Sequence, residues 1–336
     1  MQIDFYTTVI DNYWDWGFSF NLAISLFYYF PNLKIRYFID DKNLFLKLKW
    51  DIKIKNLEYY DLNEIKNLSP SNIIFNFFDR KIDFDYLHKF NFNIKLVNFS
   101  YFLLHTWVKS LHNTNYNSKN VSVTHFIPSL LDNSGWIIIN PYLKEFENQI
   151  KKEGNLALRK KFLPNLNEDF YHKNWISVFC YIETFKNIKE FILKDNKNIY
   201  FIFDYNSSKE NIINMPFLNL INYYKFLYLC DKNIVRWENS LISSILTWKP
   251  FLWDIYKEHN LAHKEKIEDF SNYLKNNFWN NFLEYIEIFK DFNNIEFSKE
   301  AFKSFIYLKE EQIFKKIKKN INVKRDLIKN VEKFLI

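Results

Sequence analysis

Glycine and cysteine are scarce in this chain of 336 residues, which contains three glycines and two cysteines. Cys180 and Cys230 are single and far apart, so they provide neither a disulfide framework nor the cysteine spacing of a metal site. The longest apolar run, residues 18–30, is too short to span a membrane and is interrupted by Asn21 and Ser25. The N-terminus has no basic segment followed by an apolar core, so no signal peptide is expected. These absences predict a soluble protein of a reducing cytoplasm.

Charge is also limited, with a formal net charge of +7 and 25% charged residues. A modest positive excess suits an acidic partner or an anionic ligand. The basic residues are dispersed, whereas a dedicated nucleic-acid binder would concentrate them in one stripe. We therefore expect neither nucleic acid nor a membrane as a partner. Aromatic residues make up 21% of the chain, so a single aromatic side chain is weak evidence for a site.

Strand-like and helix-like segments alternate along the chain, which is typical of a parallel sheet with helices on both faces. The predicted strands are residues 3–10, 34–40, 72–78 and 94–99, and then 175–180, 198–204, 232–236 and 251–255. A charged, asparagine-rich stretch without a strand pattern, residues 142–174, separates the two groups. The length also suits two domains better than one core.

We therefore predict an α/β protein with two Rossmann-like domains that face each other across a cleft. The expected parts are an N-terminal domain of residues 1–150, a C-terminal domain of residues 151–310, and a final helix, residues 311–336, that packs back on the body.

Two carboxylates, Asp11 and Asp15, and the glycine Gly17 lie between the first predicted strand and the first predicted helix. In an open α/β sheet, this turn faces the crevice beyond the carboxyl ends of the strands, where ligands bind. One aspartate could simply cap the helix, since Asp is a favoured N-cap residue. The pair, together with one of only three glycines, favours a functional site.

A second candidate site begins where a strand predicted to end near Val235 is followed by a helix. Arg236, Glu238, Asn239 and Ser240 cluster at this junction. The start of a helix offers unpaired backbone N–H groups and the positive end of a dipole, which suit a phosphate. Arg236 adds a forked cation that can grip phosphate with two hydrogen bonds. The alternative is a surface ion pair between Arg236 and Glu238 at an ordinary helix start.

Aromatic side chains end the first predicted strand of the second domain, at Phe179 and Tyr181, and Phe217 follows Pro216 in a predicted loop. Rings at strand ends beside a cleft could stack on a nucleobase. They could equally belong to the core, and the residues alone leave both interpretations open.

Taken together, these motifs resemble those of the elongation factor P arginine rhamnosyltransferases. Val-Ile-Asp-Asn-Tyr-Trp-Asp-Trp-Gly, residues 9–17, is similar to that family's Val-Asp-Asn-Tyr-Gly-Asp-Ile-Gly signature. Phe-Cys-Tyr at 179–181 is similar to a strand end of the family, and Pro-Phe-Leu at 216–218, Tyr223 and Cys230-Asp231 follow another of its runs. Residues 235–240, with 249–253, 255–256 and 262–263, are similar to its Arg-Gly-Glu-Asp-Ser…Lys-Pro-Phe-Val-Trp-Gln-Ile-Tyr…Ala-His block, without a gap from Arg236 to Tyr256.

The resemblance implies an inverting glycosyltransferase of the GT-B fold that moves L-rhamnose from dTDP-β-L-rhamnose to an arginine of elongation factor P. No metal or other cofactor is implied. The first domain would hold the acceptor and the second would bind the nucleotide sugar. The implied catalytic residues are Asp15 as base, Asp11 as its partner, and Glu238. The implied donor-binding residues are Arg236, Asn239, Ser240, Phe179, Tyr181, Phe217, Tyr256 and Gly17.

The chain departs from the family pattern at four of these positions. Trp14 and Trp237 stand where the family has glycine, and Asn239 stands where it has aspartate. Leu220 replaces the glutamine expected in the base pocket, and leucine cannot hydrogen-bond to a pyrimidine. Two alternatives to the implied function remain, namely a GT-B transferase with another acceptor and a non-catalytic binder of an acidic translation factor. An RNA-binding protein, suggested by basic charge and aromatic residues, is a third.

Overall fold

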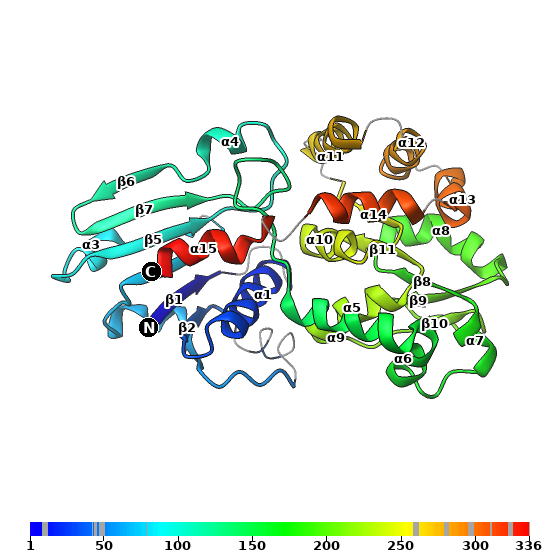
Figure 1. The fold of residues 1–336 in the computed structure, drawn as a ribbon, viewed down its shortest axis with the longest axis horizontal. Coiled ribbons are helices and arrows are strands. Elements are labelled where there is room, and N and C mark those ends of the chain that lie inside the picture. The colour runs from blue at the N-terminus through cyan, green and yellow to red at the C-terminus, as the bar shows by residue number, and fades with distance from the viewer. Residues whose placement is uncertain are drawn as a thin grey trace. The chain divides into compact units, whose positions relative to one another are not determined.

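The computed structural model describes residues 1–8, 13–41, 43, 46, 51–78, 80–257, 262–278, 282–294, 299–309, 311–321 and 325–335; the side chains of residues 13–15, 262 and 311 are not among them. The chain forms two compact units (Figure 1). Unit 1 consists of Met1–Pro141 with Val323–Ile336, and unit 2 consists of Tyr142–Asn322. The division therefore falls after Pro141, whereas the boundary predicted from the sequence lies after residue 150.

Unit 1 is built on a sheet with seven described strands, in the order β3-β2-β1-β4-β5-β7-β6. All neighbours pair in parallel except β6, which runs antiparallel to β7 at the edge. The order reverses between β1 and β4, so the carboxyl ends of these two strands form the switch point where ligands bind in such sheets. The strands are β1 (Gln2–Thr7), β2 (Lys34–Ile39), β3 (Leu57–Asp61), β4 (Ile73–Phe77), β5 (Ile94–Phe99), β6 (Asn115–Ser118) and β7 (Val121–Phe126).

A buried ion pair fixes β1 against β2 in unit 1. Arg36 donates from Nε to Asp4 Oδ1 and from Nη2 to Asp4 Oδ2, both at 2.7 Å. The Asp4 carboxylate also accepts from the backbone N–H and the hydroxyl of Ser71, both at 2.8 Å. Asp4 is fully buried, and such a charge is tolerated in a core only when it is paired and hydrogen-bonded in this way. The network thus holds the strand that leads into the first predicted site.

The helices of unit 1 come from both the N-terminal and the C-terminal parts of the chain. Helix α1 (Tyr13–Tyr29) is the next described element after β1, and α15 (Leu327–Leu335) lies beside it near the C-terminus (Figure 1). Asp326 precedes α15, and its carboxylate accepts from the backbone N–H groups of Ile139 and Ile328. The remaining described helices of this unit are η1 (Leu62–Asn67), α3 (Phe84–Leu87) and α4 (Val108–Leu111).

Unit 2 contains a second parallel sheet, whose described strands have the order β10-β9-β8-β11-β12. They are β8 (Asn174–Val178), β9 (Asn198–Ile202), β10 (Ile212–Asn214), β11 (Lys232–Arg236) and β12 (Phe251–Asp254). Strand β8 pairs with both β9 and β11, so the order reverses between β8 and β11. As in unit 1, the switch point lies at the carboxyl ends of adjacent strands.

Helices surround this sheet, and all strands predicted for the second domain are present. The helices are α5 (Pro141–Glu153), α6 (Asn155–Phe162), α7 (Glu168–His172), α8 (Ile182–Lys194), α9 (Leu220–Leu229), α10 (Glu238–Leu246), α11 (Ala262–Phe278), α12 (Leu283–Phe292), α13 (Lys299–Tyr307) and α14 (Glu311–Asn320). The final segment expected as a single helix is divided between the units. Lys318 of α14 is paired with Glu147 of α5 in unit 2, whereas α15 belongs to unit 1.

Candidate functional site

The carboxyl ends of β8 and β11 meet at the switch point of unit 2. Ile234 of β11 is in register with Val178 of β8, and the backbone N–H of Phe179 donates to the Ile234 carbonyl at 2.9 Å. The residues after each strand are therefore neighbours. We call residues 179–181 and 236–240 the strand-end cluster, since the structure brings these two groups of predicted residues together.

Arg236 is held on several sides within this cluster. Its Nη2 donates to Asp204 Oδ2 at 2.8 Å, and Nη1 donates to the Cys180 carbonyl at 3.4 Å. Its guanidinium carbon lies 4.1 Å from the ring centre of Phe179 and 4.3 Å from that of Trp237. The cation–π contacts and the ion pair fix the position of the positive charge. Asp204, which follows β9, was not predicted, because nothing local in the sequence links it to Arg236.

Glu238 begins α10, and its carboxylate lies near the positive end of the helix dipole. Lys266 Nζ of α11 lies 3.0 Å from Glu238 Oε1. Arg236 pairs with Asp204 and Glu238 pairs with Lys266, so the two residues do not form the simple surface pair that was the alternative interpretation. Lys266 is a second member of the site environment that sequence reasoning missed.

The N-terminus of α10 receives no hydrogen bond from the side chain of its N-cap residue, Trp237. Asn239 and Ser240 in the first turn are both buried. The side-chain amide of Asn239 donates to the hydroxyl of Tyr224 on α9. Replacement of aspartate by asparagine thus keeps a hydrogen bond inside the unit, and the backbone N–H groups of the first turn stay without a side-chain cap, which suits an anion.

Asp254, at the end of β12, supports the strand-end cluster from within the core. Its carboxylate accepts from the Tyr181 backbone N–H at 2.7 Å and from the Thr184 hydroxyl at 2.9 Å, at the start of α8. Burial raises the pKa of Asp254 to about 6, against the opposing effect of these two hydrogen bonds and of the cations Lys257 and Arg236. This aspartate was not identified in the sequence as part of the site.

The other predicted donor residues of unit 2 differ in exposure. Tyr256 is exposed, and its ring centre lies 5.2 Å from that of Tyr181. Phe217 is also exposed, as expected of a residue that can meet a ligand. Leu220, the first residue of α9, is buried behind the N-cap Asn219. Tyr256 thus forms an aromatic pair with Tyr181 of the strand-end cluster.

The first predicted site, in unit 1, is only partly described. Asp11 lies outside the described residues. Asp15 and Gly17 lie inside α1, because the helix already begins at Tyr13, so the prediction that both precede the first helix was wrong; the side chain of Asp15 is not described, and Gly17 is buried. Strand β1 precedes this region and lies next to β4 at the switch point of the sheet. The topology is therefore that predicted for a site after the first strand, while the roles of Asp11 and Asp15 stay predictions.

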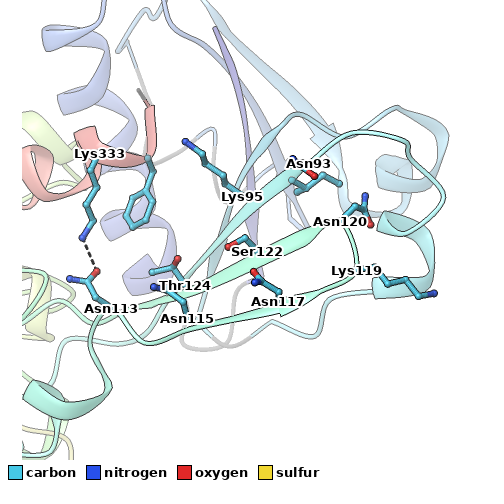
Figure 2. A pocket seen from close by; sticks show the side chains of 12 residues that line it. Asn93, Lys95, Asn113, Asn115, Asn117, Lys119, Asn120, Ser122, Thr124 and Lys333 are labelled. Atoms are coloured by element: carbon cyan, nitrogen blue, oxygen red, sulfur yellow. Dashed lines mark hydrogen bonds between the residues drawn. The ribbon is translucent and has the colours of Figure 1, made fainter.

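A separate hollow of about 870 Å³ lies on unit 1, over β5, β6, β7 and the end of α15 (Figure 2). Its lining contains the cations Lys95, Lys119 and Lys333 and many amide side chains, and Lys333 Nζ donates to Asn113 Oδ1 at 2.8 Å. None of the predicted site residues lines it.

Among the described residues, no three His, Cys, Asp or Glu side chains form a group that could hold a metal ion. Each described helix is too short or too polar to cross a membrane.

Comparison with known proteins supports the fold at the level of the whole chain. A solved structure described as the basis for EarP-mediated arginine glycosylation of translation elongation factor EF-P matches with a TM-score of 0.65 and 15% identity, over 99% of this chain and 98% of that one. A UDP-N-acetylglucosamine 2-epimerase matches with a TM-score of 0.50 and 11% identity, over 99% and 94%. The GT-B fold class predicted from the sequence is confirmed.

Curated relatives match over a shorter segment. The protein-arginine rhamnosyltransferases of Pseudomonas aeruginosa and Pseudomonas putida are 36% and 38% identical over 56 residues, 17% of this chain and 15% of each relative. That of Neisseria meningitidis is 27% identical over 66 residues, 20% of this chain and 17% of the relative. The aligned segments thus span less than a fifth of these relatives.

The model of the family described as elongation factor P (EF-P) rhamnosyltransferase EarP matches residues 3–203 and 183–336. These two matches together cover nearly the full chain, including the first predicted site and the strand-end cluster. The chain belongs to the EF-P rhamnosyltransferase EarP family.

Proposed function

We propose that this protein is a protein-arginine rhamnosyltransferase that transfers L-rhamnose from dTDP-β-L-rhamnose to an arginine side chain of EF-P, with inversion at the anomeric carbon. The observation that carries the proposal is the family match along nearly the whole chain. The strand-end cluster supports it, because a fixed guanidinium and an uncapped helix start lie together at the switch point of unit 2. A translation factor as acceptor places the reaction in the cytoplasm.

The leaving group of the proposed reaction is a nucleoside diphosphate. Arg236 and the first-turn N–H groups of α10, near Ser240, hold and stabilise its negative charge as the bond from the anomeric carbon to the diphosphate oxygen breaks. Glu238 faces the sugar side of the donor. Tyr181, Tyr256, Phe179 and Phe217 surround the nucleotide, and two of these rings, Phe217 and Tyr256, are exposed, which suits stacking on the base.

The acceptor is a poor nucleophile, because a guanidinium is protonated at physiological pH and its nitrogen lone pairs are delocalised. Asp11 and Asp15 grip the guanidinium fork and orient one nitrogen towards the anomeric carbon. That nitrogen becomes much more acidic as the C–N bond forms, and Asp15 takes its proton. The electron pair of the broken C–O bond leaves with dTDP, so the step is balanced without another reactant.

The test is incubation of the protein with dTDP-β-L-rhamnose and its cognate EF-P, followed by mass spectrometry of EF-P peptides. We expect a deoxyhexose mass gain on one arginine. Asp15→Asn should abolish this gain while calorimetry shows unchanged binding of the donor. Undiminished turnover of Asp15→Asn would contradict its role as the base, and no mass gain with the wild-type protein would contradict the activity.

The same experiment addresses the alternatives. A GT-B transferase with another acceptor would bind the donor but leave EF-P unmodified. A non-catalytic binder of an acidic translation factor would bind EF-P and not the donor. The buried Leu220 bears on this second case, because leucine supplies no hydrogen bond to a base.

A further inference from the structure

Trp237 has a backbone conformation that a tryptophan rarely adopts. It is the N-cap residue of α10, with φ of 64° and ψ of 147°. A bulky residue with positive φ is an outlier, because its Cβ collides with the backbone, and glycine is the residue that adopts this region freely. Strain of this kind persists only where the surroundings enforce it, and it is often found at functional sites.

The Trp237 side chain makes contacts that glycine could not provide. Its ring centre lies 4.3 Å from the Arg236 guanidinium carbon and 5.2 Å from the ring centre of Phe179, to which it is nearly perpendicular at 82°. The Arg236 carbon also lies 4.1 Å from the Phe179 ring centre. The guanidinium is therefore seated in a corner formed by two aromatic faces. Trp237 supplies one of these two faces.

The hydrogen bonds of Arg236 leave part of its fork unused. Nη2 donates to Asp204 and Nη1 to the Cys180 carbonyl. The buried Nε has no hydrogen-bond partner among the described residues. A guanidinium has five N–H donors. The Arg236 guanidinium, held in place by the rings and Asp204, therefore retains donors for an anion. The guanidinium is thus held by one ion pair, one carbonyl and the rings of Phe179 and Trp237, and the Tyr181 ring centre lies farther away, at 5.6 Å.

We propose that Trp237 is a positioning residue for Arg236. Its indole holds the guanidinium in the corner with Phe179, so that the remaining donors of Arg236 meet the diphosphate of a nucleotide donor. The inference rests on the proposed function in assigning a nucleoside diphosphate to this site. It goes further in that Trp237, which is not among the implied donor-binding residues, determines how strongly the diphosphate is held.

The test compares Trp237→Gly, Trp237→Phe and Arg236→Gln in the full chain, with dTDP, UDP, pyrophosphate and thymidine as calorimetric probes. Trp237→Gly suits the local backbone, so its melting temperature should not fall, and this serves as the control for folding. We expect Trp237→Gly to weaken dTDP binding about tenfold, as loss of a partly buried cation–π contact implies, and to leave thymidine binding unchanged. Trp237→Phe should restore most of the affinity, since it keeps a ring in the corner.

A double-mutant cycle separates positioning from a direct contact. If Trp237 acts through Arg236, adding Trp237→Gly to Arg236→Gln should cause no further loss of dTDP affinity. Additive losses, equal losses for dTDP and thymidine, or unchanged dTDP affinity in Trp237→Gly would each overturn the proposal. Lack of affinity for every diphosphate probe in the wild-type protein would overturn it as well. Diphosphate binding that shows the cycle, without rhamnosyl transfer to EF-P, would overturn only the proposed function.

Discussion

Asp254 is the buried carboxylate that connects the end of β12 to the start of α8, and its replacement by asparagine should make unit 2 more stable at neutral pH. The wild-type carboxylate accepts hydrogen bonds from the Tyr181 backbone N–H and from the Thr184 hydroxyl. Asparagine can keep both contacts, since its Oδ1 accepts from Tyr181 and its amide donates to the hydroxyl oxygen of Thr184. The substitution therefore removes a buried charge while preserving the geometry.

The magnitude follows from the raised pKa. The pKa of Asp254 rises from 3.8 to about 6 in the folded protein because of burial. A difference of roughly two pKa units corresponds to about 3 kcal/mol that the folded state loses when the group ionises. The raised pKa already includes the hydrogen bonds that favour the carboxylate, and asparagine resembles the protonated acid. We expect Asp254→Asn to raise the free energy of unfolding at pH 7.5 by up to about 3 kcal/mol.

The pH dependence gives a second readout with a definite sign. Between about pH 4 and pH 6, the folded wild-type protein retains a proton on Asp254 that the unfolded chain has released. Stability should therefore fall as pH rises through this window, and Asp254→Asn should lack that part of the slope. Urea unfolding between pH 4.5 and pH 7.5, followed by circular dichroism and tryptophan fluorescence, measures it.

Asp326→Asn is the matched control, because Asp326 is a buried carboxylate of unit 1 whose pKa is also raised to about 6. Asp326→Asn should change how the free energy of unfolding of unit 1 depends on pH. An Asp254→Asn variant with the wild-type pH slope, or one less stable than the wild type at pH 7.5, would refute the reasoning.

Two further pairs of substitutions test the buried ion pair of unit 1 and the strand-end cluster of unit 2. Asp4→Ala leaves the buried Arg36 guanidinium without its ion-pair partner and should lower the free energy of unfolding, measured by urea titration, by about 3–5 kcal/mol. The control Glu58→Ala breaks an exposed ion pair on β3 and should lower it by less than about 1 kcal/mol. Equal effects of the two substitutions would contradict the role of the buried pair. Glu238→Ala should weaken the binding of dTDP-β-L-rhamnose, measured by calorimetry, about tenfold, as loss of a hydrogen bond to a charged group implies. Lys266→Ala should have a smaller effect, because Glu238, the ion-pair partner of Lys266, remains. An unchanged affinity in Glu238→Ala would remove Glu238 from the donor site.

Local sequence was sufficient for the elements with a strong pattern. The apolar strands β1, β2, β4, β5, β8, β9, β11 and β12 were all predicted within a few residues, because a buried parallel strand is a short continuous apolar run. The start of α10 was also predicted, since Asn239 and Ser240 come shortly after the strand that ends at Arg236. Strands β3, β6, β7 and β10 were missed. Residues 115–118, for example, are mostly exposed and polar at the edge of the sheet, so they carry no apolar signal.

Local sequence pattern was enough to predict which residues lie at each strand end, because a strand and the turn after it are adjacent in the chain. It could not determine which strand ends are neighbours, because pairing depends on sheet order and register over long distances. The three-dimensional fold was needed to show that Asp204 pairs with Arg236, that Lys266 pairs with Glu238, and that Asp254 accepts a hydrogen bond from the Tyr181 backbone N–H. It also placed the Trp237 ring against Phe179, a residue far away in sequence, and gave Trp237 a positive φ.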